Sequence, residues 1–129
     1  MTWGQARLAC HAQGMDLAVI SSAAVNDDIR AMMATVKAGW PYWVGATDAE
    51  QEGIWRWVDG TIFWRWMDST AIGYHNWLAG EPNNVGGIEH CMEVGNGNWN
   101  DIPCDTVTLP FVCGGQGKRQ QRSVGCAGH

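Results

Sequence analysis

Residues 81–104 read EPNNVGGIEHCMEVGNGNWNDIPC, and this stretch decides how the rest of the chain is interpreted. Within it, a subset of side chains offers three carboxylates and two or three amide oxygens as ligands: Glu81, Asn83, Asn84, Glu89, Asn100 and Asp101. Calcium takes six to eight oxygen ligands in a flexible arrangement, whereas zinc and copper prefer His nitrogen or Cys sulfur. The donor set therefore favours a calcium site, whose affinity should fall as the pH drops and the carboxylates become protonated.

The alternative interpretation of this stretch is a polar surface loop in which Asn and Asp only serve turns. Pro82 adds a further observation, because an X-Pro bond between two candidate ligands could be cis and aim both side chains at one point. Of the four prolines in the chain, Pro82 is therefore the one that we expect to follow a cis bond.

The surrounding segment is acidic and has no basic partners. Between Trp66 and Gly117 the chain has no Lys or Arg, while six carboxylates fall there: Asp68, Glu81, Glu89, Glu93, Asp101 and Asp105. Such carboxylates must be solvated, protonated or bound to a cation. The whole chain has a net charge of −5, and its first 113 residues, 5 basic and 13 acidic, have a net charge of −8. This balance argues against nucleic acid as a partner.

The length of 129 residues and the hydrophobic content of 46% indicate one domain with a single core. We expect the compact domain over residues 1–113 and a flexible, Gly-rich basic tail over residues 114–129, with Lys118, Arg119 and Arg122. No run approaches the roughly 20 apolar residues of a membrane helix, and the opening residues lack the pattern of a signal peptide. The sequence therefore predicts no insertion into a membrane.

The five cysteines favour disulfides over a metal site, because they form no CxxC pair and lack clustered His. Four of them lie inside the compact region, at positions 10, 91, 104 and 113, and Cys126 lies in the tail. This arrangement predicts two bridges and one leftover thiol in an oxidising, extracellular or secreted setting. The pairing stays open at this point, since four cysteines allow three connectivities.

Two helices are predicted near the start of the chain. Thr2 and Gln5 have the spacing of a capping box, and the helix that they begin should stop at Gly14. Ser22 can cap a second amphipathic helix, which should end near Gly39.

Short strands are predicted from Trp40 onward, where apolar and aromatic runs are cut by Gly, Asp and Asn. Residues 68–98 show little periodicity and are expected to form a long loop region. Most of the nine tryptophans are expected in the core, in particular those on strand patterns: Trp43, Trp55, Trp57 and Trp99. Trp77 and Tyr74 could instead pack against the apolar face of a bound sugar, although core packing is the favoured interpretation.

Taken together, these pieces resemble a C-type lectin domain over nearly all of residues 1–113. The resemblance rests on the order and spacing of the helix ending in Cys10, of Trp43-Val44-Gly45-Ala46, Trp55-Arg56-Trp57-Val58-Asp59-Gly60, Glu81-Pro82-Asn83, Glu89-His90-Cys91, Trp99-Asn100-Asp101 and Cys104, and of Pro110-Phe111-Val112-Cys113. It implies an α+β fold in which two helices flank small antiparallel sheets with a long calcium-binding loop region. It also implies the disulfides Cys10–Cys113 and Cys91–Cys104, which leaves Cys126 unpaired.

The resemblance further implies a function. Five residues match the sugar-binding calcium site of the family position for position: Glu81, Asn83, Glu89, Asn100 and Asp101. The Glu-Pro-Asn triplet is similar to that of members selecting equatorial 3- and 4-hydroxyls, so mannose, N-acetylglucosamine, glucose or fucose are implied and galactose is disfavoured. Affinity at one open site should be weak, and useful avidity would need several copies or attached domains.

Some family members have a second calcium site, whose positions match Asp48, Glu52, Asn84 and the residue after Glu89. That residue is His90 here, which is a poor calcium ligand. An ordinary acidic loop is therefore the slightly preferred interpretation of Asp48 and Glu52.

The chain also departs from the family, whose domains normally open with a strand that pairs with the C-terminal strand. This sequence begins directly at the helix. We therefore expect either a fragment or incomplete gene model, or an exposed strand edge near Phe111 with its risk of aggregation.

Two other functions compete with sugar binding. A domain of the same fold could bind a protein or another surface, because fold does not fix function. A glycoside hydrolase could use Glu81 and Glu89 as its carboxylate pair. The enzyme is disfavoured, because an ionised calcium ligand cannot also be the proton-carrying general acid.

Overall fold

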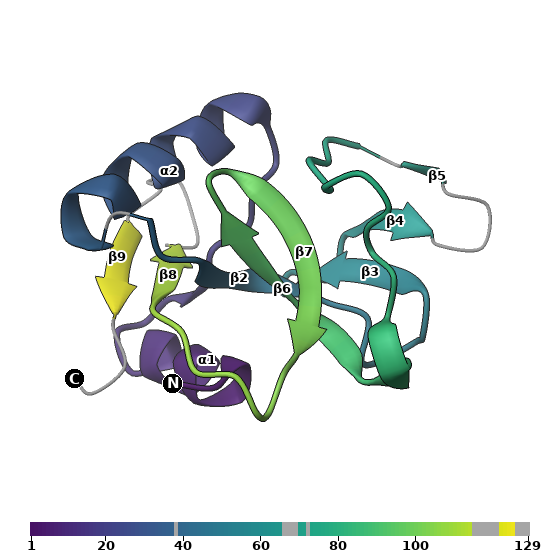
Figure 1. The fold of residues 1–129 in the computed structure, drawn as a ribbon. Coiled ribbons are helices and arrows are strands. Elements are labelled where there is room, and N and C mark those ends of the chain that lie inside the picture. Colours follow the sequence, from purple (N-terminus) through teal and green to yellow (C-terminus); the bar gives the residue numbers. More distant parts are fainter. Residues whose placement is uncertain (38, 66–69, 72, 115–121, 126–129) are drawn as a thin grey trace.

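A computed structural model describes the chain except for residues 38, 66–69, 72, 115–121 and 126–129. Two helices lie on opposite sides of the central strands, and the β3–β5 region extends away from them (Figure 1). This α+β arrangement agrees with the fold that the sequence predicts.

Both predicted helices are present. Helix α1 (Trp3–His11) begins with a capping box, in which the Gln5 amide N–H donates to the Thr2 hydroxyl and the Thr2 N–H donates to the Gln5 side chain. Helix α2 (Ala23–Lys37) begins after Ser22, whose hydroxyl accepts from the Val25 N–H at 3.2 Å. No helix among the described residues is both long and apolar enough to cross a membrane.

The strands form one hydrogen-bonded network. They are β1 (Asp16–Leu17), β2 (Tyr42–Thr47), β3 (Ile54–Trp57), β4 (Ile62–Arg65), β5 (Thr70–Ala71), β6 (Glu89–Gly95), β7 (Asn98–Pro103), β8 (Phe111–Gly114) and β9 (Arg122–Gly125). Their main order is β1-β8-β2-β3-β4-β5, while β6 joins β2 to β7 and β9 pairs with β8. All pairings between named strands are antiparallel except β2 with β8, where Trp43 lies opposite Phe111.

The long loop region is shorter than the sequence predicts. Residues 89–95, expected within it, form β6, which is hydrogen-bonded to β2 on one side and to β7 on the other. Its Cys91, Met92 and Val94 are buried. Pairing on both edges and burial outweigh the loop-like composition around this segment. Between Trp77 and β6, the described chain contains only the short 3₁₀ helix η1 (Val85–Gly87).

The core has two parts. One is built on aromatic rings, with Trp55, Trp57 and Trp99 at most 4% exposed, and the other packs α1 against Trp43 and Phe111. All four tryptophans predicted in the core are therefore buried.

Both disulfides implied by the family resemblance are present in the structure. Cys10 is bonded to Cys113 across 103 residues, and Cys91 is bonded to Cys104 across 13. Cys126, predicted to be unpaired, lies outside the described residues.

The edge at Phe111 is paired. Strand β9 pairs with all four residues of β8, from Phe111 opposite Gly125 to Gly114 opposite Arg122. Residues 122–125, which the sequence places in the tail, form this strand. Backbone hydrogen bonding to a strand edge needs no apolar side chains, so composition did not reveal it.

Candidate functional site

The loop between Trp77 and β6 positions the candidate ligands. The Glu81–Pro82 peptide bond is cis, as predicted, and Pro82 is buried. The Glu81 N–H donates to the Leu78 carbonyl at 2.9 Å, and Asn84 then turns the chain into η1 with a φ of 47°. Asn and Asp tolerate this left-handed conformation better than most residues, because their short polar side chains can form local hydrogen bonds.

Asp101 connects this loop to β7. Its carboxylate is fully buried, with one oxygen accepting from the Asn83 N–H at 3.1 Å and the other from the Asn84 N–H at 2.6 Å. The two parts of the sequence that were singled out, 81–84 and 99–101, are thereby brought together.

Glu89 begins β6 and is fixed by the same loop. Its Oε1 accepts from the Val85 N–H, and its own N–H donates to Asn84 Oδ1, both at 3.0 Å. The carboxylates of Glu81, Glu89 and Asp101 therefore gather around one turn of the chain.

The electrostatics of this group fit a cation. Glu81 Oε1 is buried without a hydrogen-bond partner. Desolvation, the hydrogen bond and charge of Asp101, and the charge of Glu89 together raise the pKa of Glu81 to about 7. Among the described residues, no Lys or Arg forms an ion pair with Glu81, Glu89 or Asp101. Buried carboxylate oxygens without protons or basic partners match the ligand chemistry of a hard divalent cation.

The side chains of the two predicted amide ligands, Asn83 and Asn100, form no hydrogen bond with the carboxylates of Glu81, Glu89 and Asp101 in the described part of the chain. The Asn83 side chain is exposed, and the printed contact of Asn83 with Asp101 is made by its backbone. The Asn100 amide donates to Glu93 Oε1 at 3.3 Å, across the β6–β7 pair. This orientation leaves the Asn100 amide oxygen without a hydrogen bond from the described residues.

Glu93 is a site neighbour that sequence reasoning did not select. Desolvation raises its pKa, hydrogen bonding to Asn100 lowers it, and the charge of Glu89 raises it, with a net increase. Only the register of the hairpin, which sets Glu93 opposite Asn100, brings it to this position.

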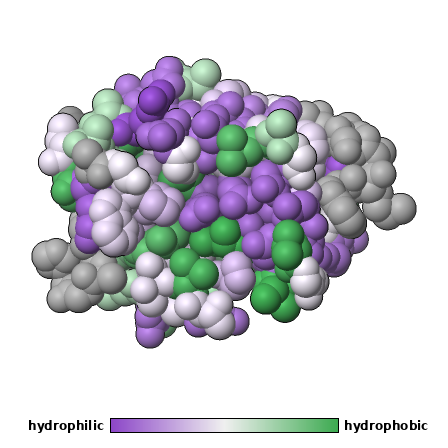
Figure 2. Space-filling view, viewed as in Figure 1, coloured by the Kyte–Doolittle hydropathy of each residue, from purple (hydrophilic) through white to green (hydrophobic). Residues whose placement is uncertain are grey.

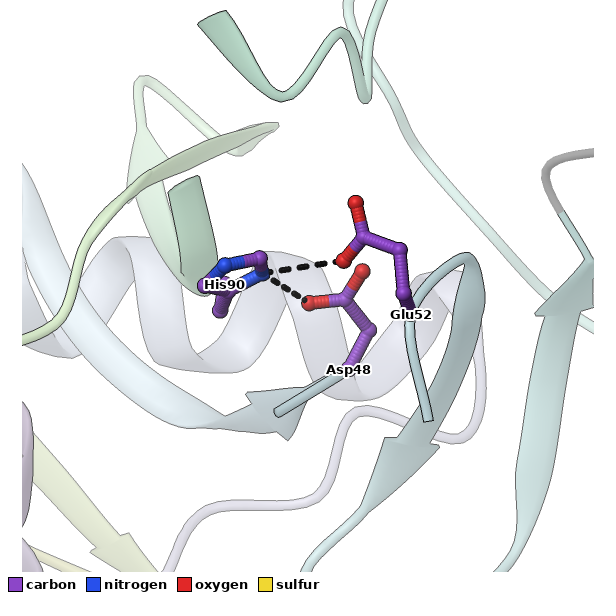
Figure 3. Close-up of side chains that lie close together, drawn as sticks. All are labelled: Asp48, Glu52 and His90. Atoms are coloured by element: carbon purple, nitrogen blue, oxygen red, sulfur yellow. Dashed lines mark hydrogen bonds and ion pairs between the residues drawn. The ribbon is translucent and has the colours of Figure 1, made fainter. Parts of the chain in front are cut away.

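A second group of side chains lies beside the first. Asp48 directly follows β2, Glu52 stands in the turn before β3, and His90 is on β6, with all three pointing toward one another (Figure 3). His90 Nδ1 lies 3.0 Å from Asp48 Oδ1 and 3.1 Å from Glu52 Oε2. The Asn84 side-chain amide donates to Glu52 Oε1, so the four residues matched to a second site do converge.

Charge interactions alter the titration of this second group. Burial alone would lower the pKa of His90, but the hydrogen bond to Asp48 and the charges of Asp48 and Glu52 raise it overall. Desolvation and the charge of Asp48 raise the pKa of Glu52.

The aromatic residues proposed as sugar contacts serve packing instead. Trp77 lies 5.0 Å from Trp55 and 6.0 Å from Trp99, measured between ring centroids, and Tyr74 packs edge-on against Trp99.

Apolar side chains are nevertheless exposed at the site. Val85 and Ile88, next to Glu89, are 61% and 60% exposed. Figure 2 shows a hydrophobic patch over η1 within a mainly hydrophilic surface.

Comparison with known proteins places these observations in a family context. A family model described as the Lectin C-type domain matches residues 1–115. The chain is 34% identical to a perlucin-like protein of Mytilus galloprovincialis, covering 86% of this chain and 68% of that protein. It is 35% identical to the hepatic lectin of Gallus gallus, where it covers 88% of this chain but only 49% of the relative.

Solved structures agree with these sequence matches. The carbohydrate-recognition domain of the mouse scavenger receptor C-type lectin has a TM-score of 0.68 and 31% identity, covering 81% of this chain and 75% of that one. The C-type carbohydrate-recognition domain of cow CD23, solved in the presence of a GlcNAc2Man3 oligosaccharide, has a TM-score of 0.63 and 34% identity, covering 81% and 71%. Herring type II antifreeze protein has a TM-score of 0.61 and 30% identity, covering 81% and 75%.

Proposed function

The chain belongs to the C-type lectin domain family, and from this premise we propose that it binds carbohydrate through a calcium ion held by Glu81, Asn83, Glu89, Asn100 and Asp101. The observation that carries the proposal is the buried, unpartnered Glu81 Oε1 beside the carboxylates of Asp101 and Glu89. A hard divalent cation would satisfy that oxygen and offset the mutual repulsion of the three carboxylates.

The proposed binding mechanism divides roles among these side chains. A bound calcium ion would offer coordination positions to two vicinal sugar hydroxyls. Glu81 and Glu89 would accept hydrogen bonds from these hydroxyls, while the amides of Asn83 and Asn100 would donate hydrogen bonds to the hydroxyl oxygens. Asp101 holds the loop through the backbone of Asn83 and Asn84, which fixes the order of acceptors and donors around the ligand.

That order supports a preference for sugars with equatorial 3- and 4-hydroxyls. Mannose, N-acetylglucosamine and glucose meet this requirement, and galactose does not, because its 4-hydroxyl is axial. Fucose also has an axial 4-hydroxyl, but its 2- and 3-hydroxyls form an equatorial vicinal pair that can take the same place. Mannose-type glycans are therefore the proposed partners. Because a single exposed site buries few ligand atoms, we expect weak monomeric affinity that several copies or further domains would strengthen.

The C-type lectin family is non-enzymatic, so Glu81 and Glu89 are assigned to binding and not to glycoside hydrolysis. The two disulfides support an extracellular or secreted location, because such bonds persist in oxidising compartments.

A second candidate function is the binding of a protein or another surface without sugar recognition. The exposed Val85 and Ile88 beside Glu89 favour it, since exposed apolar side chains gathered at one place often mark interaction sites. The similarity to an antifreeze protein shows that the same fold occurs in a protein that is not named for sugar binding.

Capture of the oxidised chain on a mannose-bearing surface tests the proposal. We expect capture in millimolar calcium, loss of capture with a chelator, and competition by free mannose but not by galactose. Glu81→Gln should abolish capture, whereas the matched control Glu50→Gln should not, because the Glu50 side chain is 79% exposed and pairs with Arg56. A folded chain that ignores sugar in the presence of calcium would instead favour the surface-binding function.

A further inference from the structure

The imidazole of His90 faces hydrogen-bond acceptors on both sides. Its Nε2 lies 3.1 Å from the carbonyl oxygen of Gly87, which can only accept, so Nε2 carries a proton. Its Nδ1 is directed at two carboxylate oxygens, 3.0 Å away on Asp48 and 3.1 Å away on Glu52. Three electron-pair donors therefore converge on one point, and either a proton on Nδ1 or a metal ion placed among them makes this arrangement favourable.

The chemistry of these donors differs from that of the calcium ligands. One imidazole nitrogen with two carboxylates is a ligand set that zinc and similar transition metals accept, whereas calcium is bound by oxygen. The bond from Nε2 to the Gly87 carbonyl has the form in which metal-binding histidines are usually oriented, with the second ring nitrogen held by a backbone carbonyl.

The spacing of the donor atoms also suits a small ion. The three ligand atoms all lie within 4.8 Å of one another. Zinc binds nitrogen and oxygen at about 2.0–2.2 Å in tetrahedral geometry, so two of its ligand atoms lie roughly 3.3–3.6 Å apart, close to the 3.0 Å and 3.1 Å between His90 Nδ1 and the two carboxylate oxygens. A shift of a few tenths of an ångström is enough to seat the ion.

The protein provides both a fixed ligand and an adjustable one. The Asp48 carboxylate is 3% exposed, and its second oxygen accepts from the Gly53 N–H at 2.9 Å, which holds it in place. The Glu52 side chain is 52% exposed and can move to complete the site. A cavity of about 10 Å³ adjoins the group and is bordered by Asp48, Glu52, Asn84 and Asp101, which is room for one small ion or water.

We propose that Asp48, Glu52 and His90 form a binding site for a transition-metal ion of the zinc class, separate from the calcium ligands around Glu81. This proposal does not rest on sugar binding, since the site uses different side chains and is read out by the metal alone.

Titration of the purified, oxidised full chain with zinc, followed by calorimetry in a large excess of calcium, tests this proposal. We expect one zinc ion per chain that calcium does not displace. His90→Gln should weaken zinc binding by more than about 100-fold, because loss of a direct ligand exceeds the 10- to 100-fold cost of losing an outer-shell contact. His90→Asp should lose the zinc preference and become displaceable by calcium, because the group then offers only oxygen.

Two control variants separate this site from other zinc-binding groups. His11→Gln is the matched control, because His11 Nε2 also lies near a carboxylate, 3.3 Å from Asp16, but has only that one acidic neighbour. Cys126→Ser removes the thiol that the sequence predicts to be unpaired. Both should bind zinc as the unsubstituted chain does, and thermal unfolding should show that every variant is folded.

Three results would overturn the proposal. They are absence of zinc binding, equal binding by folded His90→Gln, and displacement of zinc by calcium from the unsubstituted chain. A loss of zinc binding in Cys126→Ser would assign the metal to the thiol and would overturn it as well.

Discussion

Glu81 shows how a single residue links calcium binding to pH. Its pKa in the calcium-free chain is raised to about 7 by desolvation and by the carboxylates around it. Calcium must displace the proton that this carboxylate holds below that pH. We therefore expect calcium affinity to fall by about tenfold per pH unit below pH 7, as one proton is released for each ion bound.

Calcium titrations of the chain at pH values from 5.5 to 8, spaced about half a pH unit apart, measure this dependence. Asp105→Asn, which removes an exposed acidic residue outside the proposed ligand set, should leave the profile unchanged. An affinity that is flat between pH 6 and 7 would contradict the assignment of Glu81 as a ligand.

The same shift predicts how pH affects folding. The pKa of Glu81 is higher in the folded chain than its ordinary value of 4.5, so the folded state binds more protons between the two values. The contribution of Glu81 to the stability of the calcium-free chain is therefore fully present below pH 4.5 and is lost as the pH rises through about 7. Urea unfolding in chelator should show this loss, and Glu81→Gln should reduce it.

Asp101 carries a different prediction, which concerns hydrogen bonding. Its two carboxylate oxygens accept from the Asn83 and Asn84 N–H groups in a fully buried position. Asp101→Asn turns one acceptor into a donor that faces a backbone N–H. We expect a loss of about 1–3 kcal/mol in the free energy of unfolding, measured by urea in chelator. Equal stability of Asp101→Asn and the unsubstituted chain would show that these bonds do not hold the loop.

At the scale of elements, β2 depends on one residue without a side chain. A Cβ on Gly45 would lie 2.7 Å from the Leu17 carbonyl oxygen and 2.9 Å from a Val58 methyl group. The Gly45 N–H donates to Ala18 and its carbonyl accepts from Val58, so the neighbouring chains cannot move away without losing these bonds.

Gly45→Ala should therefore lower the free energy of unfolding by about 1–3 kcal/mol, as overpacking does elsewhere. Gly4→Ala is the matched control, because a Cβ on Gly4 meets nothing within 4 Å and the residue lies in helix α1. It should raise stability by about 0.5–1 kcal/mol. Thermal or urea unfolding of the two variants compares them directly, and equal effects would contradict the crowding at Gly45.

The elements differ in how far the sequence could predict them. Helix α1 follows from Thr2 and Gln5, because a capping box is a local signal whose residues lie three apart. Strand β6 does not follow from its own residues, since its hydrogen bonds come from β2 and β7, which are distant in sequence. Strand β9 was missed for the same reason, because pairing with β8 supplies what its composition lacks.

In the candidate site, too, local features could be predicted from the sequence, whereas contacts between distant residues could not. The oxygen-rich composition of residues 81–101 indicates a hard cation, but the contact of Asp101 with the backbone of Asn83 spans 18 residues and needed the family resemblance. The group of Asp48, Glu52 and His90 joins residues 42 positions apart, so its convergence followed from the family resemblance and the structure and not from local spacing.

At the scale of the whole molecule, the two disulfides close chain segments of very different length. The bond Cys10–Cys113 spans 103 residues, whereas Cys91–Cys104 spans 13. A longer closed segment removes more conformational freedom from the unfolded chain.

Replacing both cysteines of a bridge by serine should therefore cost more for Cys10 and Cys113 than for Cys91 and Cys104. The expected difference in the free energy of unfolding is roughly 2 kcal/mol. Urea unfolding measures it, with Cys126→Ser in every variant so that no thiol exchange occurs. A larger loss from the Cys91–Cys104 pair would mean that local structure, and not loop closure, dominates its contribution.

Asn84 gives the molecule a property that belongs to neither group of ligands alone. Its side-chain amide donates to Glu52, its Oδ1 accepts from the Glu89 N–H, and its backbone N–H donates to Asp101. Zinc bound at Glu52 would restrict the backbone and side-chain torsion angles of Asn84. Calcium bound at Glu89 and Asp101 requires the same torsion angles to be fixed. Thermodynamic reciprocity then requires that any factor by which zinc changes the calcium affinity equals the factor by which calcium changes the zinc affinity.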